Sequence, residues 1–447
     1  MIWAYRILFL PLLLILLPRY ILRMKRRGGY REGFGTRFGN LPHLPPKKAG
    51  VRRIWLQAVS VGEIFAAGPL IRELQKDPGL EIFLTTTTST GYALARERFR
   101  DQVVGLAYFP LDFFPFSLRT WRRVQPDLCL LMESELWPEH LHQAASRGTP
   151  LILINARISD RSYGRLSALA FLTERLLNKF SRILAASEDD ADRFIQLGAD
   201  ESIVDTSGNI KLDVNLEPIL DDNARAALRD ELGLYTPGSG GTGPKEYPPL
   251  ILGSSTWPGE ESALLRMLQR ARKEGLACQL LIVPRHMERR EEIRKTLEEF
   301  SFSFHFRTAG EAGTPVDVAV ADTTGELLMF TQLADMVFVG KSLPTNDGGQ
   351  TPIEAAAFGK ALLYGPYMSN FRTLARHLVD SDAAIVVGDD VDLADQALML
   401  LKDRGRRAKV GGNALKWHAA NRGAVRKTLE AIKETVARID GNRSNRQ

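Results

Sequence analysis

The stretch Trp55-Leu-Gln-Ala-Val-Ser-Val-Gly-Glu63 decides how the first half of this chain folds. The apolar run Ile54–Val59 predicts a buried strand, and a helical pattern begins near Ile64. Glu63 therefore stands between the carboxyl end of a strand and the start of a helix, where open α/β sheets bind ligands. Partly shielded walls would raise the pKa of a carboxylate there enough for it to accept a proton. The alternative is a helix-start Glu that only complements the helix dipole.

Short apolar runs alternate with helical patterns on either side of this stretch. The β-α-β-α rhythm predicts a mostly parallel, doubly wound α/β sheet. We expect helices over Phe65–Leu74 and Tyr92–Phe99. The expected strands of the first half are Ile54–Val59, Glu81–Thr85, Leu128–Met132, Leu151–Ile154 and Ile183–Ala186.

A Gly- and Pro-rich loop over residues 235–248 interrupts the rhythm, and a second α/β pattern follows. The expected strands of this half are Leu250–Leu252, Gln279–Val283, Val316–Val320, Met336–Val339, Lys360–Tyr364 and Ala383–Val386. Two Rossmann-like halves predict a cleft between them, a common place for small-molecule sites. The predicted divisions are an anchor with a basic flank (1–27), a first Rossmann-like domain (28–215), a linker (216–249) and a second Rossmann-like domain (250–440). From about Asp440 we expect a frayed end.

Composition limits the class of protein. The chain has 447 residues, of which 44% are hydrophobic and 25% charged, as is typical of a globular protein. Its two cysteines, Cys129 and Cys278, lie in apolar runs, so neither a disulfide framework nor a thiolate metal site is expected. This cysteine usage fits a reducing compartment. The seven histidines show no spaced ligand cluster, and we expect no metal.

The basic charge is concentrated at the front of the chain. Residues 1–53 contain twelve Lys or Arg and one acid, Glu32, so this segment carries a net charge of +11. The whole chain carries +6, so the remaining residues carry −5. Residues 2–22 are largely apolar and precede a cluster of Lys and Arg over 23–27. We predict an uncleaved membrane anchor, single-pass or monotopic, with the bulk of the protein on the cytoplasmic side. The alternative is a buried core helix with a solvated basic tail.

Nucleic-acid binding is disfavoured by the same arrangement. The basic residues flank an apolar helix and are not interleaved with aromatic residues on a folded face. An anionic membrane surface is the partner that this pattern favours, because each Lys or Arg near it contributes about 1 kcal/mol.

Polar segments follow several expected strands in the first half. The Thr-rich run Thr85–Gly91 leaves a strand and enters a helix, where hydroxyls and amides can hold an anion or a sugar. The alternative is a Thr-rich strand end with a helix-capping residue. Glu133-Ser-Glu135 places two carboxylates at one strand end, where they repel unless paired or solvated. Asn155–Ser159 follows the next strand, and Lys211 lies near the predicted crossover. A cation there would neutralise a leaving phosphate.

The second half offers loops suited to a nucleotide. Gly253–Thr256 is expected to end its first strand in a small-residue turn that admits a phosphate. Arg285, in Pro284-Arg-His286, would bind a phosphate or a base edge, or it is a surface Arg at a strand end. Thr351-Pro-Ile-Glu354 predicts a helix start. Glu354 would face the cleft and accept two ribose hydroxyls, or it is a capping-box acid.

Taken in order, these motifs resemble those of the Kdo transferases, which transfer 3-deoxy-D-manno-oct-2-ulosonic acid (Kdo) to lipid A precursors. No single motif is decisive, but their order and combination span nearly the whole chain. The matching segments are Ser60–Glu63, Thr85–Gly91, Glu133–Pro138, Asn155–Ser159, Gly208–Lys211, Pro284-Arg285 and Gly348–Glu354.

The resemblance implies a GT-B fold, in which two Rossmann-like domains face each other across a cleft. It implies inverting transfer of Kdo from CMP-Kdo, held by the second domain, to a lipid A precursor (lipid IVA), held by the first, in lipopolysaccharide biosynthesis. Glu63 would be the general base, and Glu133 and Lys211 would support the transition state, with no metal or cofactor. The implied CMP contacts are Pro284, Arg285, Thr324, Gly325, Glu326, Thr351, Pro352, Ile353 and Glu354. The expected acceptor side comprises Ser60, Gly62, Thr87, Gly91, Glu135 and Arg157.

The chain departs from the family pattern at three places. Where Gly-Gly-His-Asn-Pro-Leu-Glu is expected, it reads Gly348-Gly-Gln-Thr-Pro-Ile-Glu354, so Gln350 and Thr351 replace an imidazole and an amide. Ser134 stands where a Thr is usual, and residues 235–248 resemble an insertion. Two other functions remain open: another GT-B nucleotide-sugar transferase of lipid A assembly, and a membrane-tethered binding protein on a degenerate transferase fold.

Overall fold

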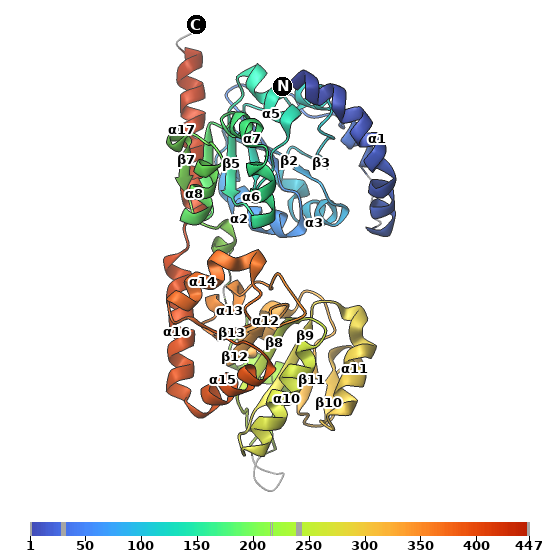
Figure 1. Ribbon diagram of the computed structural model, residues 1–447, viewed down its shortest axis with the longest axis vertical. Coiled ribbons are helices and arrows are strands. Elements are labelled where there is room, and N and C mark those ends of the chain that lie inside the picture. The colour runs from blue at the N-terminus through green and yellow to red at the C-terminus, as the bar shows by residue number, and fades with distance from the viewer. Residues whose placement is uncertain (1, 28–32, 215, 217, 238–243, 445–447) are drawn as a thin grey trace. The chain divides into compact units, whose positions relative to one another are not determined.

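The computed structural model describes residues 2–27, 33–214, 216, 218–237 and 244–444. The chain divides into two compact units (Figure 1). Unit 1 comprises Met1–Asn215 and Asn421–Gln447, and unit 2 comprises Leu216–Ala420. Each unit contains one parallel seven-stranded sheet. The predicted α/β class with two parallel Rossmann-like sheets is therefore confirmed.

The sheet of unit 1 has the strand order β3-β2-β1-β4-β5-β6-β7. Its strands are β1 (Arg52–Gln57), β2 (Leu80–Thr86), β3 (Gly105–Tyr108), β4 (Leu128–Met132), β5 (Leu151–Ala156), β6 (Arg182–Ala185) and β7 (Val204–Thr206). Its helices are α1 (Ile2–Arg27), η1 (Phe34–Phe38), α2 (Val61–Gln75), α3 (Ser89–Phe99), η2 (Arg100–Gln102), α4 (Phe114–Val124), α5 (Pro138–Arg147), α6 (Asp160–Ser167), α7 (Ala170–Leu177), α8 (Glu188–Gln196), η3 (Glu201–Ile203), η4 (Ile210–Asp213) and α17 (Ala424–Ser444).

Helices cover both faces of this sheet. Ile54 and Leu56 of β1 belong to a core with α2, α3 and α17, whereas Trp55 belongs to a second core with α4, α5, α7 and α8. Successive side chains of a strand point to opposite faces, so a strand buried on both faces reads as a continuous apolar run.

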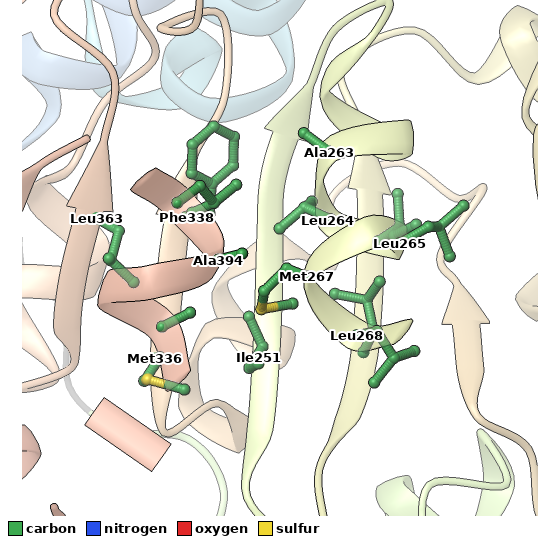
Figure 2. Packing of buried hydrophobic residues seen from close by; sticks show 14 of the residues in the cluster. Ile251, Ala263, Leu264, Leu265, Met267, Leu268, Met336, Phe338, Leu363 and Ala394 are labelled. Atoms are coloured by element: carbon green, nitrogen blue, oxygen red, sulfur yellow. The ribbon is translucent and has the colours of Figure 1, made fainter. Parts of the chain in front are cut away.

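The sheet of unit 2 has the order β10-β11-β9-β8-β12-β13-β14. Its strands are β8 (Leu250–Thr256), β9 (Gln279–Pro284), β10 (Phe304–Phe306), β11 (Val318–Val320), β12 (Met336–Val339), β13 (Ala361–Tyr364) and β14 (Ala384–Val386). Its helices are α9 (Asp222–Glu231), α10 (Glu260–Lys273), η6 (Met287–Arg289), α11 (Arg290–Glu299), η7 (Arg307–Ala309), α12 (Leu327–Leu333), α13 (Ile353–Ala357), η8 (Ser369–Phe371), α14 (Arg372–Asp380), α15 (Asp390–Lys402) and α16 (Arg404–Ala420). Figure 2 shows Leu264 and Leu268 of α10 beside Ile251 of β8 in the core of this unit.

Both sheets contain a topological switch point, where the strand order reverses. In unit 1 the chain runs outward from β1 through β2 and β3, and then returns to β4 on the other side of β1. In unit 2 the corresponding reversal lies between β8 and β12. Open α/β sheets bind ligands outside the carboxyl ends of the strands at such points.

The predicted strands are all present. β8 extends four residues beyond its predicted end, and the others differ by at most two residues at either end, but three short strands were not predicted. These are β3, β7 and β10, and none of them is a long apolar run. The prediction of a turn at Gly253–Thr256 is wrong, because these residues continue β8 and pair with β9. An irregularity in that pairing falls at Ser255, whose φ is 54°.

The ends of the predicted domains also differ from the observed units. Helix α17 belongs to unit 1 and packs against α2 and η4, although residues up to 440 were assigned to the second domain. The Asp213 carboxylate accepts the backbone N–H groups of Gly423 and Val425, which fixes the start of α17. The helix continues to Ser444, beyond the expected fraying at Asp440. The predicted linker contains α9 and belongs to unit 2.

Helix α1 lies against α5 in unit 1. The Arg6 guanidinium donates to both carboxylate oxygens of Glu139, at 2.8 and 2.9 Å, and the Glu139 side chain is fully buried. The Tyr5 hydroxyl donates to Asp112 at 2.6 Å, and Phe9 stacks on Phe113. Within the described part of the chain, no helix meets the length and apolarity that crossing a bilayer requires.

Candidate active site

Glu63 occupies the first turn of α2, directly after β1. The backbone N–H of Val59 donates to one carboxylate oxygen at 2.8 Å, and the Ser60 hydroxyl donates to the other at 2.9 Å. The Val59 carbonyl accepts the N–H groups of Thr87 and Thr88 in turn. Val59 therefore leaves the sheet, and β1 ends at Gln57 rather than at the predicted Val59. These contacts fix the orientation of a carboxylate that is only 7% exposed.

Glu133 follows β4, the neighbour of β1 in the sheet. Its backbone is left-handed, with φ of 59°, which is unfavourable for a residue other than glycine. The Lys211 ammonium donates to its carboxylate at 2.9 Å, and Arg157 lies at 4.0 Å. Strained residues at the carboxyl end of a sheet are frequent at functional sites.

Two acids of this cluster, Glu63 and Glu135, have raised pKa values. Burial and, next, the charge of Glu133 raise the pKa of Glu63 to about 7, although the hydrogen bonds from Val59 and Ser60 and the charge of Lys211 lower it. Burial also raises the pKa of Glu135 to about 8, together with the charge of Glu63. Near neutral pH, Glu63 therefore exists in both its charged and neutral forms, as proton transfer requires.

The predicted catalytic residues are thus brought together within unit 1. Glu63 follows β1 and Glu133 follows β4, so the two flank the switch point of this sheet. Glu135 accepts a hydrogen bond from the Trp137 indole at 2.6 Å and interacts electrostatically with Glu63. Lys211, in η4 beyond β7, reaches back to Glu133.

The remaining predicted acceptor-side residues surround the start of α2 and α3. The Thr87 hydroxyl accepts a hydrogen bond from the Gln57 side chain at 3.1 Å, and Gly62 lies exposed in the first turn of α2. A Cβ atom at Gly91 would lie 2.7 Å from the Thr86 hydroxyl and 2.8 Å from the Thr88 hydroxyl, so a side chain at this position would have to displace them. Thr88 caps α3 through the N–H of Gly91, which is the capping arrangement considered for this run.

The predicted nucleotide residues lie in loops of unit 2. Pro284 ends β9, and the exposed Arg285 follows with its backbone N–H bonded to the carbonyl of Thr256 at 3.1 Å. The Thr324 hydroxyl lies 3.1 Å from the sulfur of Met287, which connects the loops after β11 and β9.

Two predicted nucleotide residues use their carboxylates in local contacts. Glu326, next to Gly325, accepts a hydrogen bond from Arg307 at 3.3 Å. Burial raises the pKa of Glu354, while a hydrogen bond with the Thr351 side chain lowers it. The Thr351 hydroxyl also accepts the N–H of Ile353, after Pro352, at the start of α13. The N-cap of α13 is Pro352, which makes no side-chain capping bond, so the expected cap at Thr351 is wrong and these contacts are not the capping box considered for Glu354.

Sequence reasoning missed a second cluster, at the switch point of unit 2. The Glu260 carboxylate, 1% exposed, accepts four backbone N–H groups: those of Trp257, Lys341, Ser342 and Leu343, at 2.8 to 3.2 Å. One buried acid thereby joins the loops that follow β8 and β12. No local pattern signals this role, because three of the four donors lie more than 80 residues away in sequence.

Comparisons with known proteins agree with one another. The family model of 3-deoxy-D-manno-octulosonic-acid transferases (kdotransferases) matches residues 32–214. The 3-deoxy-D-manno-octulosonic acid transferase of Haemophilus influenzae is 33% identical over 434 residues, which cover 96% of this chain and 95% of that protein. The enzyme of the same name from Bordetella pertussis is 34% identical, over 92% and 94%.

Among solved structures, the UDP-GlcNAc 2-epimerase of Neisseria meningitidis bound to UDP-GlcNAc is similar in fold. Its TM-score is 0.59 at 14% identity, and the match covers 86% of this chain and 100% of that one. At this identity the likeness concerns the fold alone, which is GT-B-like.

Proposed function

We propose that this chain, which belongs to the 3-deoxy-D-manno-octulosonic acid (Kdo) transferase family, moves Kdo from CMP-Kdo to a lipid A precursor. The family consists of glycosyltransferases of lipopolysaccharide biosynthesis. In the proposed transfer, the configuration at the anomeric carbon of Kdo is inverted. The observation that carries this proposal is the position of Glu63. Its oriented carboxylate has a pKa near 7 and flanks the switch point of unit 1 beside Glu133 and Lys211.

In the proposed step, Glu63 acts as the general base. It removes the proton from a glucosamine hydroxyl of the acceptor while that oxygen attacks the anomeric carbon of Kdo. The bond from this carbon to the phosphate oxygen breaks, and CMP leaves from the opposite face with the bonding electrons. A positioned base contributes about 10²–10⁴-fold, because a neutral sugar hydroxyl is a poor nucleophile. The hydrogen bonds from Val59 and Ser60 support this role by orienting the carboxylate.

Glu133 and Lys211 are proposed to support the transition state as a pair. The ammonium of Lys211 is 2.9 Å from Glu133, and both side chains remain about one quarter exposed, so a substrate can reach them. Arg157, at 4.0 Å from the same carboxylate, adds a second cation. Positive charge at this position would stabilise the negative charge that develops on the departing phosphate.

Unit 2 is proposed to bind the nucleotide. Arg285 is exposed at the end of β9, where it is available to a phosphate. The segments around Thr324 and Thr351 follow β11 and β12 at the same edge of the parallel sheet. Gln350 and Thr351 can still donate and accept hydrogen bonds, although they differ from the residues that the family pattern leads one to expect.

Helix α1 is proposed to hold the enzyme at the cytoplasmic face of the inner membrane by lying in the bilayer interface. At about 100° per residue, its exposed large apolar side chains fill a continuous arc of about 160°. They are Trp3, Ile7, Leu8, Leu10, Leu14, Ile15 and Leu22. The residues that dock on the protein, Tyr5, Arg6 and Phe9, lie on the opposite arc. A helix with one docked and one apolar exposed face fits a monotopic anchor better than a spanning one.

Incubation of the purified protein with a lipid A precursor and CMP-Kdo, followed by mass spectrometry, tests the proposed reaction. We expect a discrete mass increase for each Kdo unit. Transfer from UDP-sugars instead, with thermal stabilisation by UDP and not by CMP, would overturn it in favour of another nucleotide-sugar transferase. The membrane proposal is tested separately: Ile7→Asp with Leu14→Asp should release the protein from anionic vesicles. The matched control, Val386→Asp, replaces an exposed apolar residue of unit 2 and should not release it.

A further inference from the structure

The switch point of unit 2 carries an aromatic residue and a cation with no role in the mechanism above. Trp257 is the first residue after β8, and Lys341 is the second residue after β12. These two strands flank the reversal of strand order, where sheets of this type bind ligands. In unit 1, Glu63 and Glu133 lie beyond the ends of the two strands that flank its switch point, β1 and β4.

The backbone of Lys341 is held in an unfavourable conformation. Its φ is 60°, in the left-handed region that glycine adopts freely and other residues rarely do. The N–H of Lys341 donates to the buried Glu260 carboxylate at 2.8 Å, and its carbonyl accepts the N–H of Gly349 at 2.9 Å. The fold thus keeps a long cationic side chain at a position where glycine would adopt the same backbone conformation without strain. Such strain is a common sign of function.

The Lys341 side chain extends over the Trp257 ring. Its Nζ atom lies 4.7 Å from the ring centroid, and His286 meets the same ring edge-on at 5.2 Å. In the described part of the chain, no carboxylate forms an ion pair with Lys341. The nearby Glu260 accepts four backbone N–H groups. The Trp257 Nε1 atom is buried without a hydrogen-bond acceptor among the described residues.

Two donors at this switch point therefore lack an acceptor, and an anion is their chemical complement. Gly348 lies beside the ammonium, since a Cβ atom there would be 3.1 Å from Lys341 Nζ. The backbone N–H of Gln350 bonds to Gly340 at 3.0 Å, so the Gln350-Thr351 segment lies alongside. Arg285 belongs to the adjacent loop, through its backbone bond to Thr256.

We propose that Lys341, held over Trp257, binds an anionic group of the donor, either the phosphate of the nucleotide or the carboxylate of the sugar. The proposal rests on the proposed function, because it assumes a CMP-activated acidic sugar as the donor. A lysine suits this task as a compact point charge with three donors. The aromatic ring beneath it shields the ammonium from water on one side and is itself attracted to the cation.

Calorimetric titration of the full-length protein with cytidine, CMP and CMP-Kdo tests the proposal. The informative variant is Lys341→Gly, because glycine accepts the left-handed backbone and keeps the fold. Lys295→Met removes an exposed lysine of α11 and serves as the matched charge control. Loss of one charge-assisted hydrogen bond should weaken anion binding about tenfold or more. Cytidine affinity should stay the same, and Lys295→Met should bind all three ligands like the wild type.

The pattern of loss identifies the anion. Weaker binding of both CMP and CMP-Kdo by Lys341→Gly assigns the phosphate, and weaker binding of CMP-Kdo alone assigns the carboxylate. Unchanged affinity for both, in a protein whose wild type binds them, would overturn the inference and leave the proposed function standing. Failure of the wild type to bind either cytidine nucleotide would instead overturn the proposed function, and this inference with it.

Discussion

Replacing Ser60 by Ala should make the Glu63 carboxylate harder to ionise. The Ser60 hydroxyl donates a 2.9 Å hydrogen bond to Glu63, and this bond lowers the pKa of the carboxyl against the effects of burial and Glu133. A donor that stabilises the charged form lowers an acid's pKa, so its loss must raise the pKa above its present value of about 7.

The size of the change follows from the bond that is lost. A hydrogen bond to a charged group contributes about 1.5–3 kcal/mol, and one pKa unit corresponds to about 1.36 kcal/mol. Ser60 is half-buried, so water replaces part of the lost bond, and we expect a rise of about one unit. At pH 6 the ionised fraction of Glu63 would then fall about tenfold, whereas at pH 9 it would change by only about a tenth.

The assay is the pH dependence of kcat/KM for Kdo transfer, between pH 5.5 and 9.5. The acid limb of wild type should have its midpoint near pH 7, and that of Ser60→Ala near pH 8. Ser60→Thr keeps the hydroxyl and should keep the wild-type midpoint. An unchanged midpoint in Ser60→Ala, or one moved to lower pH, would refute the assignment of this limb to Glu63.

Three further predictions concern stability. The folded protein raises the pKa of Glu63 from 4.5 to about 7, so the contribution of the protonated carboxyl to folding stability is complete below pH 4.5 and is lost as pH rises through 7. Glu63→Gln should therefore be more stable than wild type at pH 8, by about 3 kcal/mol at most. Urea unfolding at pH 8 that shows no such gain would contradict this prediction. Arg6→Met leaves the buried Glu139 without its cation and should cost about 3 kcal/mol, seen as a lower Tm. Removal of the exposed Lys245, which pairs with Asp230, should leave the Tm almost unchanged. Phe338→Ala opens a cavity in the fully buried core of unit 2 and should cost about 3–5 kcal/mol in urea unfolding, and a cost below about 1 kcal/mol would show that the core collapses to fill it.

The central strands were predictable because burial on both faces leaves a continuous apolar run in the sequence. Leu128–Met132 and Met336–Val339 were predicted to the residue, since Asp127 and Glu133 bound the first run and Asp335 and Gly340 the second. The short edge strand Val204–Thr206 has no such signature, and its extended state depends on pairing with β6. The turn expected at Gly253–Thr256 failed because small polar residues also tolerate a strand when a neighbour pairs with them.

The part of the candidate site that directly follows strands was predictable from the sequence. Glu63 and Glu133 were found because each directly follows an apolar run, and the parallel sheet places such positions at one edge. Glu63 lies in the first turn of α2, where the helix-dipole interpretation also places it, and its contacts with Val59 and Ser60 orient the carboxylate. Glu260 and Lys341 were missed because their partnership joins residues 81 apart and depends on tertiary structure.

Single-turnover transfer by Glu63→Gln, followed by mass spectrometry of the lipid product, tests the central claim most directly. Glu73→Gln, in the last turns of the same helix α2, is the matched control. The account predicts that Glu63→Gln folds and binds CMP like the wild type but adds Kdo at least about 10²-fold more slowly, while Glu73→Gln retains full activity. Transfer by Glu63→Gln at the wild-type rate would contradict the account.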